Sequence, residues 1–175
     1  MLTIRSAKPQ DAEALLAIYA PYVTDTAITF EYDVPTAEEF RSRIENTLKK
    51  YPYLVAEKDD RILGYAYAGV FKGRAAYDHC VETSIYVEQS CQGMGIGKIL
   101  YNALEEALKQ QGILNVNACI SWIDTPNEYL THQSPDFHAH MGYEKVAHFH
   151  LCGYKFNKWF DMIWMEKMIG EHKGI

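Results

Sequence analysis

The chain has 175 residues, of which 48% are hydrophobic and 23% are charged, a composition typical of a globular protein with a single core. Its formal net charge of −6 excludes a general electrostatic attraction to nucleic acid or to an anionic membrane, so we expect neither partner. The N-terminal residues contain no apolar run long enough for a signal peptide or a membrane span. The four cysteines are scattered, without a C-x-x-C pair. We therefore expect one domain over residues 1–175, located in the cytoplasm with reduced thiols.

The first half of the chain alternates between strand and helix patterns. Residues 2–7 alternate like a strand, and residues 8–23 have helical spacing, with Pro21 expected to end or bend the helix. Residues 36–50 form a helix that opens with a capping box of Thr36 and Glu39. Residues 53–71 predict a hairpin that turns at Asp59 and Asp60, and residues 80–87 predict a further strand.

The second half continues the same alternation. A helix runs from Gly95 to Gln111 with Gly112 as its C-cap, and residues 115–123 form a strand. Residues 134–142 predict a short helix with Ser134 as N-cap and Pro135 in the first turn. Residues 143–152 and 158–169 predict two closing strands. This order indicates an α+β fold with a mixed sheet.

The segment "QGMGIG", residues 92–97, carries three glycines between a strand and a helix. Such a loop turns backbone N–H groups toward an anion at the positive end of a helix. The spacing lacks the G-x-G-x-x-G of a dinucleotide site, and Ile99 follows Lys98 where a Walker A loop requires Ser or Thr. A turn that only lets the helix and strand pack closely is the structural alternative. A pyrophosphate carrying a long uncharged arm is the ligand that fits best.

The same segment matches the Q/R-x-x-G-x-G/A signature of the GNAT acetyltransferases. The blocks "FEYDVPT", "LVAE", "GYAYAGVFKGRAAYDHCVETSIYV" and "GYKFNKWFDMIWMEKMI" are similar in order and spacing to the phosphinothricin N-acetyltransferase branch of that family. The resemblance implies a mixed central sheet with a splayed strand pair, flanked by helices. It also implies acetyl-CoA as co-substrate and a homodimer.

The resemblance assigns the cofactor site to three segments. The family's N-x-x-S segment is altered here, because Asn127 comes several residues too early and Thr131 stands at its spacing before Ser134. Asn157 also replaces a glycine common in the closing block. The implied cofactor residues are Ile85, Tyr86, Val87, Gln92, Gly93, Met94, Gly95, Ile96, Gly97, Lys98, Thr131 and Ser134.

The resemblance also implies catalytic and acceptor residues. Glu82 stands where the family has its general base, which removes the amine proton directly or through water. His138 stands where many members have a tyrosine that protonates the departing thiolate, although a helix histidine without that role is the alternative. Arg74 and Tyr77 match residues near the acceptor pocket, and an arginine suits a carboxylate or phosphinate. The wall or rim of this pocket is expected to include Phe30, Lys155 and Trp159, unless these residues are simply core.

Two H-x-H pairs, His138/His140 and His148/His150, raise the question of a metal site. Alternate residues of a strand share a face, so His148 and His150 can converge. No further cysteine or acidic cluster in the sequence completes a zinc set, so we predict no metal and favour surface or dimer-facing histidines.

The predicted activity is transfer of acetyl from acetyl-CoA to the amine of a small amino-acid-like acceptor, such as phosphinothricin or methionine sulfoximine. The transfer is direct, with a strand amide near Ile85–Val87 stabilising the oxyanion. Two alternatives remain open: acetylation of a protein N-terminus or lysine, and a non-catalytic acyl-CoA-binding module. Loss of the base would mark the latter, but Glu82 is present.

Overall fold

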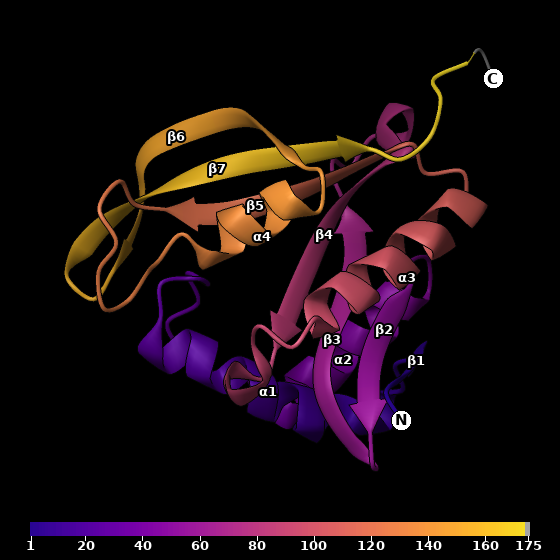
Figure 1. The fold of residues 1–175 in the computed structure, drawn as a ribbon, viewed down its shortest axis with the longest axis horizontal. Helices are drawn as coiled ribbons and strands as arrows, with labels where there is room; N and C mark the ends of the chain where they lie inside the picture. The colour runs from indigo at the N-terminus through magenta and orange to yellow at the C-terminus, as the bar shows by residue number, and fades with distance from the viewer. Residues whose placement is uncertain (174–175) are drawn as a thin grey trace.

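The computed structural model describes residues 1–173, and its centre is a seven-stranded sheet in the order β1-β2-β3-β4-β5-β7-β6 (Figure 1). The strands are β1 (Thr3–Ser6), β2 (Tyr53–Lys58), β3 (Arg61–Val70), β4 (Cys80–Val87), β5 (Asn115–Trp122), β6 (Glu144–Lys155) and β7 (Lys158–Met168). The helices are α1 (Ala12–Asp25), α2 (Ala37–Leu48), α3 (Ile96–Gln110) and α4 (Gln133–His140). Only β4 and β5 are parallel, and the other neighbours are antiparallel. The predicted order of helices and strands and the α+β class are confirmed.

The helices cover both faces of the sheet. In Figure 1, strands β2 to β4 run between α3 and the pair formed by α1 and α2. The core on the α1–α2 side contains Leu15, Ile44 and the β3 residue Tyr65, all buried. The core on the α3 side contains Leu100 and Leu104, packed against residues of β2 to β5. Each strand therefore buries alternate residues on opposite faces, as the period-2 pattern requires.

Local signals set several of the element boundaries. The capping box of α2 forms as predicted: the Thr36 hydroxyl accepts from the Glu39 N–H at 3.1 Å, and the Glu39 carboxylate accepts from the Thr36 N–H at 2.7 Å. The β2–β3 hairpin turns at Asp59 and Asp60, whose φ values of 51° and 60° are typical of a two-residue type I′ turn.

The β6–β7 hairpin has the same kind of turn. Phe156 and Asn157 have φ values of 51° and 56°. Asparagine adopts this left-handed conformation more readily than most residues. Asn157 is therefore compatible with the turn in the place of the family's glycine.

Two predicted details need correction. Helix α1 continues past Pro21 to Asp25, so the alternative in which Pro21 ends the helix is wrong. Helix α4 begins one residue early, with His132 as N-cap and no side-chain cap, so Ser134 is not the N-cap. The buried face of α3 also includes Glu105, whose Oε2 pairs with Lys167 of β7 at 2.7 Å, which offsets part of the cost of burying its charge.

The edge strand β6 is irregular. Its register with β7 shifts between Lys145 and Ala147 and again between Phe149 and Gly153, and Leu151 between them has φ of 47°. None of the helices in residues 1–173 combines the length and apolar character that crossing a membrane requires.

Candidate active site

A gap between β4 and β5 is the central feature of the sheet. Their parallel pairing ends at Glu82 and Asn117, although β4 stays paired with β3 to its end. The Thr83 hydroxyl donates to the Asn117 carbonyl at 3.3 Å, just where the strands separate. Figure 1 shows the two strands diverging from this end. Among the described residues, no strand pairs with this edge of β4 beyond Glu82, and the edge includes Ile85, Tyr86 and Val87.

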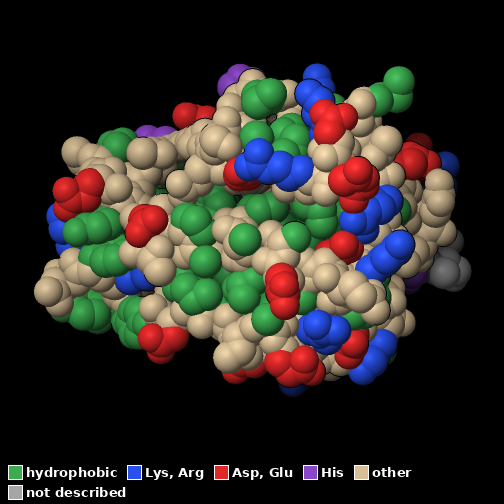
Figure 2. All heavy atoms as spheres, turned by 90° about the horizontal axis from the view of Figure 1, so that it is seen from below, with side chains coloured by type: hydrophobic (Ala, Val, Ile, Leu, Met, Phe, Trp, Pro, Cys, Tyr) green, Lys and Arg blue, Asp and Glu red, His purple; other side chains and the backbone are tan. Residues whose placement is uncertain are grey.

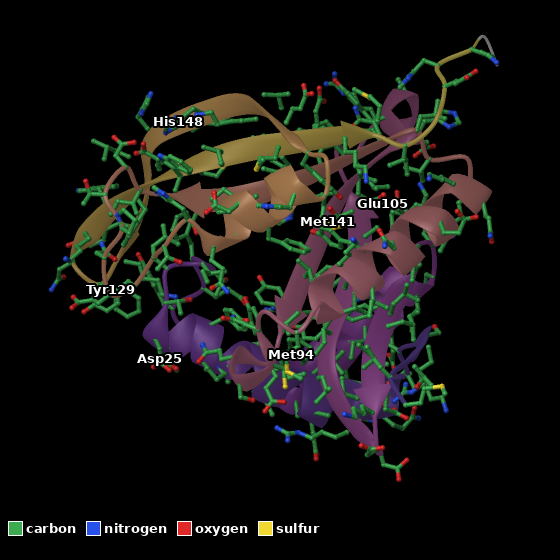
Figure 3. All side chains as sticks on the ribbon, viewed as in Figure 1. Asp25, Met94, Glu105, Tyr129, Met141 and His148 are labelled. Carbon is green, nitrogen blue, oxygen red and sulfur yellow. The ribbon has the colours of Figure 1, made fainter. Side chains whose placement is uncertain are left out.

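The glycine loop follows β4 and leads into α3. Gly93 and Gly95 have φ of 77° and 80°, which other residues adopt only under strain. A Cβ added at either glycine would have no atom of the described chain within 4 Å, so the backbone is open on that side. Gly95 is the N-cap of α3, whose first N–H groups lack partners within the helix. Figure 3 labels the exposed Met94 on this loop.

The remaining residues of the loop have other surroundings. A Cβ on Gly97 would lie 3.1 Å from the Phe137 ring, so this glycine lets α4 pack against α3. The Ile96 side chain is buried in the core, which leaves only its main-chain N–H for a ligand. Lys98 lies in the first turn of α3, where a cation adds to the attraction for an anion.

The Gln92 side chain holds the loop in place. Its amide donates to the Tyr22 hydroxyl at 2.9 Å, and its oxygen accepts from the Gln133 amide at 3.1 Å. Tyr22 in turn donates to the Val87 carbonyl at 2.5 Å. One N–H of Gln92 remains for a ligand, because a primary amide has two.

The contact between Gln133 and Gln92 places the start of α4 beside the glycine loop. Thr131 is exposed just before α4, and its hydroxyl accepts from the Gln133 N–H at 3.4 Å. Ser134 lies in the first turn of α4 and is half-buried. Both predicted residues flank Gln133 closely along the chain, but among the described residues no hydrogen bond joins either of them to the glycine loop.

His138 is buried between α4 and α3, with 3% of its surface exposed. Its Nδ1 faces the Ser134 carbonyl at 2.8 Å and therefore carries the proton, and its Nε2 accepts from the Tyr101 hydroxyl at 2.9 Å. Burial lowers the pKa of His138 to about 4, against the opposing effect of the Ser134 carbonyl. The ring is neutral at neutral pH and both nitrogens are occupied. This geometry argues against a general acid and indicates a link between α3 and α4.

Glu82 lies at the last paired position of β4, half-buried, where the gap begins. Burial raises the pKa of its carboxyl above the usual value, and the nearby Lys72 ammonium lowers it by a smaller amount. No side-chain hydrogen bond joins this carboxylate to another of the described residues. The Lys72 nitrogen lies 5.2 Å from the Phe71 ring centroid and 5.9 Å from that of Trp164. A carboxylate of raised pKa beside an exposed cation is suited to take a proton from an amine.

A tyrosine-rich cavity of about 340 Å³ lies between the sheet and helices α1 and α2. Its Tyr67 pairs in register with Ser84, two residues from Glu82, so the cavity lies on the same stretch of β4 as that carboxylate. At its side the Arg43 guanidinium forms an ion pair with Glu31 at 2.6 Å. The abundance of tyrosine, 13 residues in all, is the only sequence signal for this cavity. The lining residues are Tyr19, Phe40, Arg43, Asn46, Thr47, Tyr53, Tyr65, Tyr67 and Tyr86.

The predicted acceptor residues do not form one pocket within a single chain. Arg74 and Tyr77 are exposed in the segment between β3 and β4. Trp159 is 58% exposed near the tip of the β6–β7 hairpin, at the opposite end of the sheet in Figure 1. Phe30 is half-buried beside that hairpin, where a Cβ on Gly153 would overlap its ring at 2.4 Å.

Lys155 is buried, with only 4% of its surface exposed. It therefore does not lie at the rim of an open pocket, where the resemblance placed it. Its ammonium donates to the carbonyls of Thr26 and Thr29, at 2.8 Å each. Burial lowers the pKa of this lysine, against the smaller effect of Glu31. The contacts tie the end of α1 to the β6–β7 hairpin, which is a structural role.

Known acetyltransferases are similar to this protein over most of its length. A family model described as an acetyltransferase (GNAT) domain matches residues 4–164. Phosphinothricin N-acetyltransferase from Streptomyces viridochromogenes is 33% identical over 159 residues, which cover 91% of this chain and 83% of that protein. An L-methionine sulfoximine/L-methionine sulfone acetyltransferase from Salmonella typhimurium is 28% identical over 172 residues, which cover 98% of this chain and 96% of that protein. The solved structure of a GNAT superfamily phosphinothricin acetyltransferase from Sinorhizobium meliloti, in complex with acetyl-CoA, has a TM-score of 0.87 and 30% identity, covering 97% of this chain and 89% of that chain.

Proposed function

The chain belongs to the GNAT acetyltransferase family and is an acetyl-CoA-dependent N-acetyltransferase, and from this premise we propose its acceptor class and its mechanism. The acceptor is the primary amine of a small amino-acid-like molecule of the phosphinothricin or methionine sulfoximine type. The acetyl group passes directly to that amine, and Glu82 is the general base. The observation that carries the proposal is the end of the β4–β5 pairing at Glu82, because it puts a half-buried carboxylate at the opening of the gap.

The glycine loop fits the pyrophosphate of acetyl-CoA. Gly93 and Gly95 leave open space where side chains would stand, and the N-terminus of α3 adds unpaired N–H groups. Lys98 adds a positive charge and Gln92 one amide N–H. The edge of β4 at Ile85–Val87 offers main-chain groups to the extended arm and an N–H to the developing oxyanion. We assign Thr131 and Ser134 to the same site, since Gln133 between them bonds to the loop.

Glu82 supplies the proton transfer. A free amine must lose a proton to become nucleophilic, and a carboxylate whose pKa is raised by burial is a better acceptor for it than an exposed one. Lys72 next to it keeps the carboxylate charged before the amine arrives and offers a cation for the acceptor's own acid group. The mechanism gives no step to His138, whose nitrogens are both engaged.

The proposed acceptor class is supported by the relatives and by the tyrosine-lined cavity between the sheet and helices α1 and α2. The named relatives act on phosphinothricin and on methionine sulfoximine or sulfone, which are small amino-acid-like amines. The tyrosine-lined cavity has the size of a small-molecule site. Arg74, Tyr77, Phe30 and Trp159 remain proposed acceptor residues, and their separation within one chain suggests that two chains complete each site.

We further propose that the protein is a homodimer. Exposed apolar side chains gather on the β6–β7 hairpin, and Figure 2 shows hydrophobic surface on that side of the lower face. The hairpin residues include Tyr154 and Trp159, 43% and 58% exposed. Such a patch is typical of an interface. We also propose that the chain is a single domain that acts in the cytoplasm, and its four free cysteines fit a reducing compartment.

A thiol-release assay with acetyl-CoA tests the acceptor class. The panel contains phosphinothricin, methionine sulfoximine, methionine sulfone, ordinary amino acids, polyamines and peptides. We expect the highest kcat/KM with a member of the first three. Preference for a peptide N-terminus or a lysine side chain would favour the protein-acetylating alternative. Binding of acetyl-CoA without release of thiol to any acceptor would favour the non-catalytic alternative.

A further inference from the structure

Two histidines and an aspartate meet on the outer part of the sheet, away from the acetyl-transfer site. His148 Nε2 lies 2.7 Å from Asp161 Oδ2, and His150 Nδ1 lies 3.2 Å from the same oxygen. The three possible ligand atoms all lie within 4.8 Å of one another. Figure 3 shows His148 on β6, the edge strand, far from Met94 on the glycine loop.

The irregular course of β6 creates this arrangement. His148 is in register with Ile163 and Phe149 with Met162, and pairing resumes only at Gly153 with Phe160. Between these points the backbone of β6 bulges over Asp161, as expected where one strand has extra residues. The sequence alone hides the third member of the cluster, because Asp161 comes from the neighbouring strand at an irregular register.

The aspartate is held in a fixed orientation. Its Oδ1 accepts the Leu151 N–H at 2.7 Å, in the bulge, which leaves Oδ2 directed at the two imidazoles. Asp161 is buried, with 9% of its surface exposed, and the Trp122 ring lies 6.2 Å from the ring of His148. A carboxylate oriented by a backbone N–H through its second oxygen is the usual environment of a metal-bound carboxylate.

Two imidazole nitrogens and a carboxylate oxygen form a ligand set that suits Zn²⁺ and similar ions. Ligand atoms about 2.0–2.2 Å from a tetrahedrally coordinated ion lie roughly 3.3–3.6 Å apart. The three atoms here lie within 4.8 Å of one another, and the two imidazole–carboxylate pairs, now at 2.7 and 3.2 Å, would open slightly to admit the ion. His150, whose side chain is 74% exposed, has room to turn. Each neutral imidazole would carry its proton on the outward nitrogen and turn the other to the ion. Calcium and magnesium, which prefer all-oxygen sites, suit this set poorly.

The cluster is separate from the catalytic face. Asp161 shares a face of β7 with Ile163, which is buried in the core on the α3 side. Trp164, whose ring lies beside Lys72, is on the other face with the base. We propose that His148, His150 and Asp161 bind a divalent transition metal ion, with Zn²⁺ as the best fit, which holds the edge strand β6 on β7. The site is structural and takes no part in acetyl transfer.

Calorimetry with Zn²⁺ on the untagged, chelator-treated protein tests the site. We expect saturable binding of one ion per chain and a rise in Tm, since the ion binds the folded chain preferentially. His150→Gln should weaken Zn²⁺ binding by more than about tenfold. The residue is exposed, so this variant should fold normally. Asp161→Asn should weaken binding as strongly, while Mg²⁺ should give no saturable signal.

His140→Gln is the matched control. His140 is exposed, and its Nδ1 bonds to the Asp136 carbonyl, outside the cluster, so its loss should leave Zn²⁺ binding unchanged. Substitution by Co²⁺ gives a second readout, because a tetrahedral nitrogen and oxygen site produces visible absorption bands that should disappear in His150→Gln. The proposal is overturned if Zn²⁺ gives no saturable binding, or if His150→Gln and His140→Gln bind it alike.

Discussion

Replacing Glu82 by Gln removes the proposed base while keeping the size of the side chain. The carboxylate stands where β4 and β5 part, without a side-chain hydrogen bond to another described residue, so the change breaks no such bond. General-base assistance is worth about 10²–10⁴-fold in rate. At 1.36 kcal/mol for each factor of ten, this corresponds to about 2.7–5.4 kcal/mol in the activation barrier. We expect kcat with the best acceptor to fall by that range.

The assay is a pH–rate profile of the wild type and Glu82→Gln, with acetyl-CoA affinity measured in parallel. Affinity should be nearly unchanged, because the glycine loop lies at the other end of β4. Part of the lost rate should return at high pH, where more of the amine is already neutral. Glu82→Asp keeps a carboxylate one methylene further away and should keep an intermediate rate. Glu106→Gln, an exposed carboxylate on α3, is the surface control.

The same substitution has a predictable effect on stability. The folded-state pKa of Glu82 is raised by burial, so its favourable contribution is present at acidic pH and is lost as the pH rises through the raised value. At neutral pH the charged carboxylate therefore destabilises the fold. Glu82→Gln should be more stable than the wild type, and the difference should grow from acidic to neutral pH.

In the kinetic assay, a wild-type kcat with an unchanged pH profile in Glu82→Gln would remove Glu82 from the mechanism, and the proton would then leave by another route.

The remaining predictions concern binding, assembly and stability. Gly95→Val should abolish acetyl-CoA binding in calorimetry, because φ of 80° excludes a branched side chain and the Cβ would occupy the open face of the loop; unchanged affinity in a folded variant would refute the assignment. Light scattering at micromolar concentration should give twice the chain mass of 20.1 kDa, and a monomer would contradict the proposed dimer. Lys155→Met should lower the free energy of unfolding by about 1–3 kcal/mol, since two buried carbonyls lose their donor. Urea unfolding checks this against Lys158→Met, which changes an exposed lysine in the same hairpin. An equal loss of unfolding free energy in both variants would show that the two Lys155 hydrogen bonds do not stabilise the fold by this amount.

The sequence predicts best the features that depend on neighbours along the chain. The capping box of Thr36 and Glu39, the turn at Asp59 and Asp60 and the glycine at the start of α3 are all local, because each requires a particular residue within four positions. The order of strands follows from the resemblance and from the alternating pattern. The splay of β4 was implied by the family alone, since no local rule says where a parallel pair separates.

The sequence predicts poorly the features that depend on distant segments. The tyrosine cavity joins α1, α2 and strands β2 to β4, so no short motif describes it. His138 and Lys155 are candidates for chemistry in the sequence, yet in the structure the first is bonded by Tyr101 and the second by the carbonyls of Thr26 and Thr29. Burial and partner bonds decide the role of a titratable residue, and neither can be seen in a motif.

Tyr22 connects the two halves of the proposed site. It lies in α1, the helix that borders the tyrosine cavity, and its hydroxyl donates to the Val87 carbonyl at the end of β4 while accepting from Gln92 in the glycine loop. A shift of α1 when an acceptor enters the cavity would therefore act on the strand edge and on the glycine loop through one hydroxyl. The glycine loop and the proposed acceptor cavity are thus linked through α1.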